Sequence, residues 1–190
     1  MFTRADLEAL TEIVADAWTA GADRDWSAQA GTVEWTCTRT ADHAVDCVFA
    51  PAFFLASRRT DGYPDAGENF TVGADATPAQ LVEALRIASR VLAAVVADAD
   101  PSVRAVIFRR PDVITAPPPD FLPRGALELI LHAHDVCKGL GVPFEPPVTV
   151  CAHLLEHTAG FPYAAVGWGK PDPVAPDPWG ELLRATGRAR

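Results

Sequence analysis

The sequence predicts an all-α protein, folded as an antiparallel bundle of helices in a single domain over residues 1–190. Apolar residues recur at intervals of three and four along several stretches that are long enough for helices. The β-branched run most typical of a strand is short, VRAVIF at 103–108. Helical stretches joined by longish connections are typical of a bundle, because each helix must bury an apolar face against its neighbours.

The first two helices are expected in the N-terminal third of the chain. One runs from about Thr3 to Ala20, with Thr3 as its cap and apolar residues at helical spacing behind it. The next begins in the sequence TADH, with Thr40 as its cap, and continues to about Arg58. Pro51 lies inside this second helix, where a proline is expected to kink or interrupt it.

The third helix has the clearest start signal in the sequence. Thr77 is a good capping residue, and Pro78 follows at the first helical position, where proline is favoured. The segment before it, 59–76, is polar and rich in turn-forming residues. After the helix, 103–108 is expected as a strand or the arm of a hairpin, and 115–123 (TAPPPDFLP) as a loop.

Two further helices and a C-terminal extension complete the expected fold. The fourth helix spans 123–139 or 123–141, according to which of two glycines ends it, and the fifth spans 148–158, closed by Gly160. The remaining segment, 160–190, is expected as a loop that leads to a short helix in WGELLRATGR.

Charge and composition narrow the classes of partner. The chain has 25 acidic and 16 basic side chains and a formal net charge of −9, which disfavours nucleic-acid phosphates and anionic membranes as partners. The opening MFTRADLEAL does not read as a signal peptide, no apolar run reaches the length of a membrane span, and the four cysteines form no CxxC pair. These features favour a cytoplasmic protein with free thiols. A monomer and a homodimer are both left open.

The fourth helix carries a polar face in an otherwise apolar segment, RGALELILHAHDV at 124–136. Glu128, His132 and Asp135 share one side of the helix, and His134 points away from it. Glu and His one turn apart can present two ligands to one metal ion, because both side chains lean the same way. The alternative is a simple Glu–His hydrogen bond at the edge of a helix.

A histidine on the second helix can extend this polar face into a metal site. If His43 faces inward, it completes a His–Glu–His set with Glu128 and His132, and three protein ligands with a vacant position are typical of a catalytic zinc site. The alternative places His43 on the helix surface. Asp135 can serve as an acceptor for a ligating histidine, or as a capping charge without chemistry.

Two other metal motifs are weaker. HLLEH at 153–157 matches the inverted zinc-peptidase signature, but the only glutamate downstream is Glu181, so paired structural histidines are favoured. His43 and Cys47 resemble the start of a zinc anti-sigma motif, but the second cysteine of that motif is replaced by Ala50. Cys47 is therefore interpreted mainly as a small buried hydrophobic residue, although it shares a face with His43.

Three segments together resemble the metal-binding domain of the mycothiol-dependent maleylpyruvate isomerase family, within the DinB-like four-helix bundles. The segment 33–43 (VEWTCTRTADH) is similar to the Trp-Thr segment that leads into the helix of the first ligand histidine. The segment 124–144 is similar to the family's Arg-x3-Glu-x3-His-x2-Asp helix, and 177–188 to its closing helix, which ends in Thr-Gly-Arg. The three segments and the helix between them cover nearly the whole chain.

The resemblance implies a DinB-like bundle that holds one divalent metal ion, expected to be zinc, through His43, Glu128 and His132. The open position would take water or the sulfur of a low-molecular-weight thiol such as mycothiol, and the thiolate would attack an electrophilic small molecule. The implied reaction is cis–trans isomerisation or S-transfer, with Asp135 as the catalytic residue and Arg124 as the residue that binds the cofactor.

Two alternative functions remain open. One is a module that binds a metal or a small ligand without turnover. The other is a hydrolase that uses zinc-bound water, with Asp135 or Asp46 as the base. Arg124 and Arg39 are candidates to pair with a substrate carboxylate, and the alternative for both is a solvated surface position.

Overall fold

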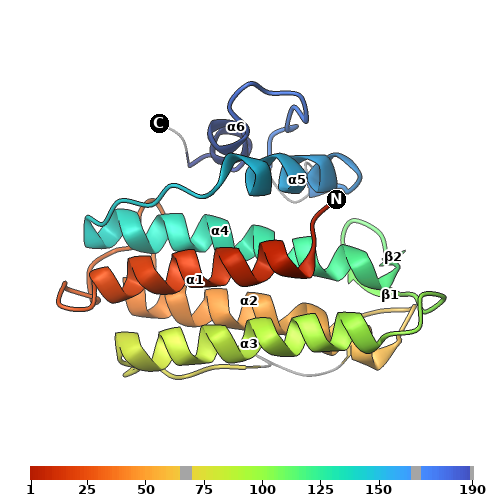
Figure 1. Cartoon of the computed structure of the whole chain (residues 1–190), viewed down its shortest axis with the longest axis horizontal. Helices are drawn as coiled ribbons and strands as arrows, with labels where there is room; N and C mark the ends of the chain where they lie inside the picture. The colour runs from red at the N-terminus through yellow and green to blue at the C-terminus, as the bar shows by residue number, and fades with distance from the viewer. Residues whose placement is uncertain (65–69, 164–167, 189–190) are drawn as a thin grey trace.

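The computed structural model describes residues 1–64, 70–163 and 168–188 and confirms a mostly helical protein (Figure 1). The described residues form six α-helices, one 3-10 helix and one two-stranded sheet. The elements are α1 (Arg4–Ala20), α2 (Cys37–Ser57), α3 (Pro78–Asp98), β1 (Ala105–Phe108), β2 (Ile114–Ala116), η1 (Pro118–Asp120), α4 (Phe121–Leu140), α5 (Val148–Ala159) and α6 (Pro178–Ala185).

The four long helices, α1 to α4, pack side by side, but not in the purely antiparallel order that the sequence predicts. The pairs α2/α4 and α1/α3 run in opposite directions, whereas α2 and α3 run in the same direction (Figure 1). Leu55 and Val95, near the C-terminal ends of α2 and α3, line one surface pocket. The parallel pair arises because the connection between α2 and α3 returns along the length of the bundle, as in bundles with a long crossover.

Two of the expected helix starts are confirmed as capping boxes. Thr3 accepts a hydrogen bond from the backbone of Asp6, whose side chain bonds back to the Thr3 backbone. Thr77 and Gln80 make the same reciprocal pair at the start of α3. Each box satisfies backbone N–H groups that have no partner inside the helix, so these starts follow from local sequence alone.

The expected cap of α2 is wrong, and the difference matters for the site. The cap is Thr36, whose Oγ1 accepts a hydrogen bond from the Arg39 N–H at 3.2 Å. Thr40 lies inside the helix, fully buried, and its N–H bonds to the Thr36 carbonyl at 2.9 Å. Since α2 begins at Cys37, His43 lies in the second turn, firmly within the helix.

The helix α2 continues through Pro51 without interruption. Proline has no N–H, so the Cys47 carbonyl one turn earlier lacks its usual helical donor. Of the two effects expected of Pro51, a kink or an interruption, the interruption is therefore wrong. Packing of the buried residues on either side of Pro51 holds the helix together.

The segment 103–108 is confirmed as the arm of a hairpin. Strand β1 pairs antiparallel with β2, with Ala105 opposite Ala116. The expected loop 115–123 is wrong, because it contains the end of β2, all of η1 and the first residues of α4. The helix α4 starts at Phe121 and takes Pro123 into its first turn, where a missing N–H costs nothing.

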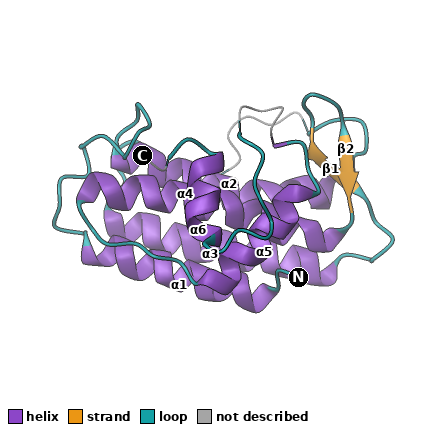
Figure 2. Ribbon diagram, turned by 90° about the horizontal axis from the view of Figure 1, so that it is seen from above, coloured by secondary structure: helices purple, strands orange, loops and turns teal. Residues whose placement is uncertain are grey.

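The C-terminal half follows the expected glycine signals. Gly141 ends α4 with φ +67°, a backbone conformation that favours glycine, and Gly160 follows the last residue of α5. Helix α6 is confirmed in the C-terminal extension, and residues 164–167 of the expected loop lie outside the described residues. Helix α5 packs on α4 and α6 packs on α5, which adds a second layer to the bundle (Figures 1 and 2).

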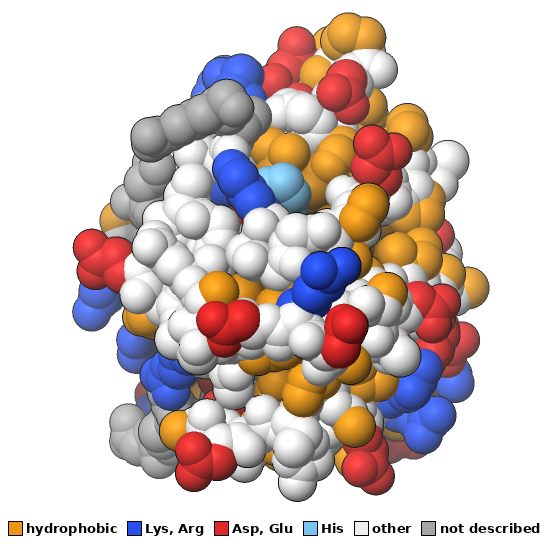
Figure 3. Space-filling model, turned by 90° about the vertical axis from the view of Figure 1, so that its left-hand side faces the viewer, with side chains coloured by type: hydrophobic (Ala, Val, Ile, Leu, Met, Phe, Trp, Pro, Cys, Tyr) orange, Lys and Arg blue, Asp and Glu red, His pale blue; other side chains and the backbone are white. Residues whose placement is uncertain are grey.

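The surface carries charges of both signs. On the face in Figure 3, acidic and basic side chains are interspersed among hydrophobic and neutral ones. Within residues 1–64, 70–163 and 168–188, no helix combines the length and the apolar character needed to cross a membrane.

A few polar side chains are buried inside the otherwise apolar core. They are Thr11, Thr40, Asp42, Ser89, His132, Asp135 and Thr158. Two of them, His132 and Asp135, belong to the polar face that the sequence predicts on the fourth helix. Buried ionisable groups are costly unless they are paired or bind a ligand, so the surroundings of this pair identify the candidate site.

Candidate metal centre

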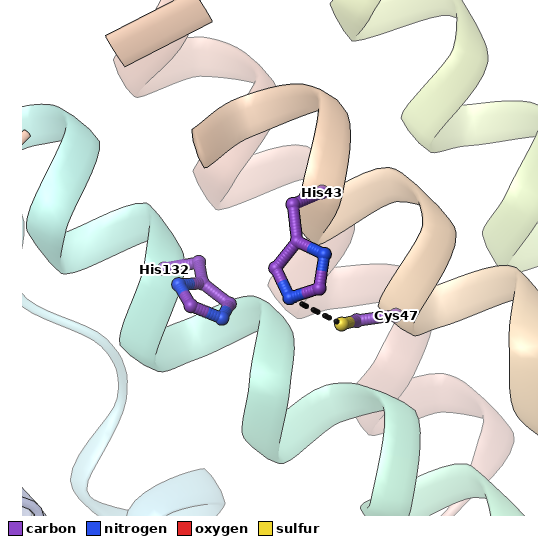
Figure 4. Close-up of side chains that lie close together, drawn as sticks. All are labelled: His43, Cys47 and His132. Atoms are coloured by element: carbon purple, nitrogen blue, oxygen red, sulfur yellow. Dashed lines mark hydrogen bonds between the residues drawn. The ribbon is translucent and has the colours of Figure 1, made fainter. Parts of the chain in front are cut away.

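Two helices bring three potential metal ligands together. His43 and Cys47 come from α2 and His132 from α4, and one ligand atom from each lies within 4.8 Å of the others (Figure 4). His43 Nε2 is 3.3 Å from Cys47 Sγ. The His43 and His132 rings lie 5.0 Å apart between centroids, with their planes at 73°. The predicted meeting of His43 and His132 across two helices is therefore observed.

One pair in this group, His43 and Cys47, has the spacing of two ligands of a tetrahedral metal ion. Zinc binds nitrogen at about 2.0–2.1 Å and thiolate sulfur at about 2.3 Å, which places neighbouring ligands roughly 3.3–3.8 Å apart. The His43–Cys47 separation of 3.3 Å falls in that range. Imidazole with thiolate is also a donor set that suits zinc better than magnesium or calcium.

The environment of His43 favours its ligating, neutral form. Burial lowers the pKa of His43, and the neighbouring His132 lowers it further, against an opposing effect of Glu128. The Trp35 ring packs edge-on against His43, 5.0 Å between centroids. Burial also raises the pKa of the Cys47 thiol, with Glu128 adding to the rise.

Glu128 lies beside this group, between Arg124 and His132. Its Oε2 is 3.7 Å from His132 Nε2, and its Oε1 is 2.5 Å from Nη1 of Arg124. Burial alone would raise the pKa of Glu128, but the Arg124 guanidinium and then His132 lower it to about 2. The structure thus places the predicted ligand next to His132, with one oxygen held by Arg124 and the other facing the histidine.

Cys47 is the site residue to which the sequence analysis gives least weight. Its one-turn spacing from His43 is the available signal, because residues four apart on a helix project from the same face. The spacing cannot show that His132 also approaches Cys47, since that contact joins two helices far apart in the sequence.

Asp135 lies beside Nδ1 of His132, on the opposite side of the ring from Glu128. Its carboxylate is 1% exposed, and Oδ2 lies 3.5 Å from His132 Nδ1. Arg188, beyond α6, binds both carboxylate oxygens with N–O distances of 2.9–3.1 Å. Burial would raise the pKa of Asp135, but the neighbouring His132 and Arg188 lower it. Gly31, at φ +50°, lies so close that a Cβ there would be 3.1 Å from the Asp135 Cα.

The two candidate arginines differ in their surroundings. The Arg124 side chain is 20% exposed, pairs with Glu128 and lies over the Phe108 ring at 5.1 Å, so a solvated surface position is wrong for it. The guanidinium of Arg39 lies over the Trp35 ring at 5.5 Å, at the side of the site where Trp35 contacts His43.

The remaining histidines lie outside the group. His134 points away from the polar face, as predicted, and its ring packs against Trp179 at 5.5 Å. In the HLLEH segment on α5, His153 Nδ1 is 3.8 Å from an Asp6 oxygen, and the His157 ring packs on Phe161 at 4.6 Å. Neither belongs to the metal group found among the described residues.

Protonation of His157 is expected to destabilise the fold at low pH. Burial and then Arg124 lower the pKa of His157 to about 4, against about 6.5 in an unfolded chain. The unfolded state therefore binds more protons below pH 6.5, and stability falls as the pH drops towards 4, by on the order of 2–3 kcal/mol from this group.

Urea denaturation of the wild type and of His157→Phe at pH 7 and pH 4.5 measures this loss of unfolding free energy. We expect the variant to lose less stability, and equal losses would contradict the assignment.

Comparison with known proteins identifies a shared fold. No protein-family model and no curated protein matches the chain. Among solved structures, the chain is similar to the crystal structure of a histidine-to-alanine mutant of a mycothiol-dependent maleylpyruvate isomerase. The TM-score is 0.52 at 14% identity, covering 82% of this chain and 72% of that one. The arrangement of helices is therefore one that a mycothiol-dependent enzyme also uses.

Proposed function

We propose that this chain is a metal-dependent enzyme of the DinB-like bundle type that activates a low-molecular-weight thiol, such as mycothiol, for attack on an electrophilic small molecule. The observation that carries the proposal is the convergence of His43, Cys47 and His132 from two helices. The shared fold with a mycothiol-dependent isomerase supports the choice of reaction class.

The proposed ligands are His43 and His132 with Glu128 as the third donor, in line with the family resemblance. Glu128 Oε2 faces His132 Nε2 at 3.7 Å, a spacing that fits two ligands of one ion. Cys47 is the alternative to Glu128 as the third ligand, because its sulfur already lies close to the imidazoles of His43 and His132. Zinc is the proposed metal, and when bound it would lower the pKa of a thiol at the open position.

The neighbouring residues would orient the ligands and the thiol. Asp135 lies against Nδ1 of His132, so Nε2 is left for the metal, and Arg188 fixes the carboxylate in turn. Arg124 holds Glu128 and would bind the thiol co-substrate. In the reaction, the thiol would lose its proton to solvent, sulfur would bond to the electrophilic carbon, and the π electrons of the substrate double bond would move away from that carbon. Isomerisation breaks that C–S bond again and restores the double bond, whereas S-transfer keeps the C–S bond and adds a proton to the substrate.

A second candidate is a metal-binding module without turnover. Three donors lie close together, the two imidazoles and the Cys47 thiol, and Glu128 lies beside one of the imidazoles. If all four bind, the coordination sphere is closed, which is typical of structural zinc. The hydrolase alternative is less well supported, because Asp135 is held by Arg188 and Asp46 accepts a hydrogen bond from the Phe70 N–H at 3.0 Å.

Cobalt(II) substitution distinguishes these functions. Cobalt bound to thiolate gives a sulfur-to-metal charge-transfer band in the near ultraviolet, so the spectrum reports each sulfur ligand. The proposed enzyme is expected to gain such intensity when mycothiol is added, because the open position takes the thiol sulfur. A spectrum that mycothiol leaves unchanged would contradict the proposal and favour the closed module.

Substitution of the two competing donors identifies the third ligand. If Glu128 fills that place, Glu128→Gln lowers cobalt affinity by on the order of 100-fold and Cys47→Ser leaves it within about threefold. We expect this result. A thiolate band in the mycothiol-free wild type that Cys47→Ser removes would assign the place to Cys47 instead.

A further inference from the structure

A second recognition site lies next to the proposed metal centre. A pocket of about 260 Å³ opens where the β1–β2 hairpin meets α4 and the described residues that follow α5. Its lining residues are aromatic or charged: Tyr63, Phe108, Arg109, Arg110, Arg124, Glu128, Tyr163 and Trp168. The sequence analysis identifies only Arg124 and Glu128 among them.

The pocket walls combine flat aromatic rings with excess positive charge. Trp168 stacks on Tyr163 at 4.5 Å between ring centroids, with 29° between the ring planes, so each ring holds the other in the wall. Three arginines face one glutamate, and Arg124 is already paired with that glutamate. The charges of Arg109 and Arg110 are therefore left to attract an anion, and guanidinium groups are well suited to bind a carboxylate.

A buried hydroxyl in the wall points to a missing hydrogen-bond partner. Tyr163 is 2% exposed, and its hydroxyl makes no hydrogen bond among the described residues. Buried polar groups in folded proteins are nearly always paired, and Tyr163 lines the pocket, so its hydroxyl is the wall group that a ligand atom would pair with. The other phenol in the wall differs, because the Tyr63 hydroxyl already donates to the Ile107 carbonyl at 2.9 Å.

The pocket and the metal group share one side chain. Glu128 lines the pocket and lies 3.7 Å from His132 Nε2, and Arg124 lies over the Phe108 ring in the pocket wall. A molecule bound in the pocket is thus one side chain away from the proposed metal position. An electrophile bound in this pocket would therefore lie beside a thiol that is held at the metal.

We propose that this pocket binds an aryl-conjugated carboxylic acid, with the carboxylate at Arg109, Arg110 and the Tyr163 hydroxyl and the ring against Trp168. The electrophilic role of this acid rests on the proposed function, whereas its binding does not. The small volume restricts the ligand to a compact planar acid, and a double bond conjugated with the ring and the carboxylate gives the carbon that a thiolate attacks.

Calorimetric titration with cinnamate tests the proposal on metal-free and zinc-loaded protein. Cinnamamide, a neutral analogue of the same shape, is expected to bind at least about tenfold more weakly, because it lacks the charge. Crotonate, which lacks the ring, is expected to bind more weakly as well. Equal affinities for cinnamate and cinnamamide would overturn the proposal.

Matched variants locate the binding. Tyr163→Phe is expected to weaken cinnamate binding about tenfold without lowering the melting temperature, because the free protein loses only an unpaired hydroxyl. Tyr63→Phe is the control for a phenol that already has a partner, and it should change the affinity less.

Arg110→Gln is expected to weaken cinnamate binding about tenfold. Arg104→Gln, on the same hairpin but outside the pocket, should leave the affinity unchanged. Cinnamate binding that neither Tyr163→Phe nor Arg110→Gln weakens would overturn the proposal.

The two proposals fail separately. Cinnamate binding to the metal-free protein depends on the pocket alone, and the cobalt spectrum with mycothiol depends on the metal centre alone. If mycothiol leaves the cobalt spectrum unchanged while cinnamate still binds in a way that depends on Tyr163, the proposed thiol chemistry is wrong and the proposed pocket is supported.

Discussion

Replacement of His43 by alanine is expected to remove stoichiometric metal from the purified protein. The wild type should carry about one equivalent of zinc, because His43 and His132 converge with a third donor at ligand spacing. Zinc sites with three or four donors have apparent binding free energies of about 10–16 kcal/mol. Loss of one donor should therefore weaken binding on the order of 100- to 1000-fold. Elemental analysis and a competition titration with a chromogenic chelator measure both quantities.

A matched control for this variant is His134→Ala. His134 lies two residues from His132 on the same helix, but its ring packs against Trp179 and not in the metal group. It should retain about one equivalent of metal. If His43→Ala keeps its metal as well, the proposed site is wrong and the two histidines are only packed against each other.

Replacement of Arg188 by methionine is expected to destabilise the protein by about 3–5 kcal/mol. Asp135 is 1% exposed and Arg188 holds both of its oxygens, so the variant leaves a buried charge without its cation. Urea denaturation at pH 7 gives the change in unfolding free energy. Because Asp135 also lies against His132 Nδ1, zinc affinity should fall roughly 10- to 100-fold in the same variant.

Two further variants separate the buried pair from a general effect of charge. Arg184→Met removes an arginine from α6 whose side chain is 60% exposed and pairs with Glu181, so its cost should be about 0–1 kcal/mol. Adding Asp135→Asn to the Arg188→Met background should recover part of the stability, because the uncompensated charge is gone. Equal losses in Arg188→Met and Arg184→Met would show that the Asp135 pair contributes nothing special.

The local features of the fold could be predicted from the sequence. Thr3, Thr77 and Gly141 mark helix ends through contacts within a few residues, so their signals are readable in the chain itself. The cap of α2 was predicted wrongly because Thr36 and Thr40 are both capping residues one turn apart. The choice between them depends on the backbone before the helix, where the Cys37 N–H bonds to the Ala28 carbonyl.

The site could be predicted only in part. One-turn spacing places Glu128 and His132 on one face, and both the position of His43 on the neighbouring helix and the resemblance indicate that it joins them. The sequence gives little weight to Cys47, because nothing in it shows which residue of α2 faces His132. Arg188 could not be assigned a partner, since its contact with Asp135 spans 53 residues and depends on how α6 packs.

The contact between Arg188 and Asp135 also links the orientation of His132 to the segment beyond α6. His43 and His132 lie on helices that pack directly against each other, so their approach does not depend on that segment. Arg188 reaches Asp135 from a segment whose helix packs on α5, outside the four-helix layer, and such outer segments can open without unfolding the core. While Arg188 is away, the carboxylate behind His132 lacks its cation, and an ion bound at that moment would meet an imidazole that is free to turn.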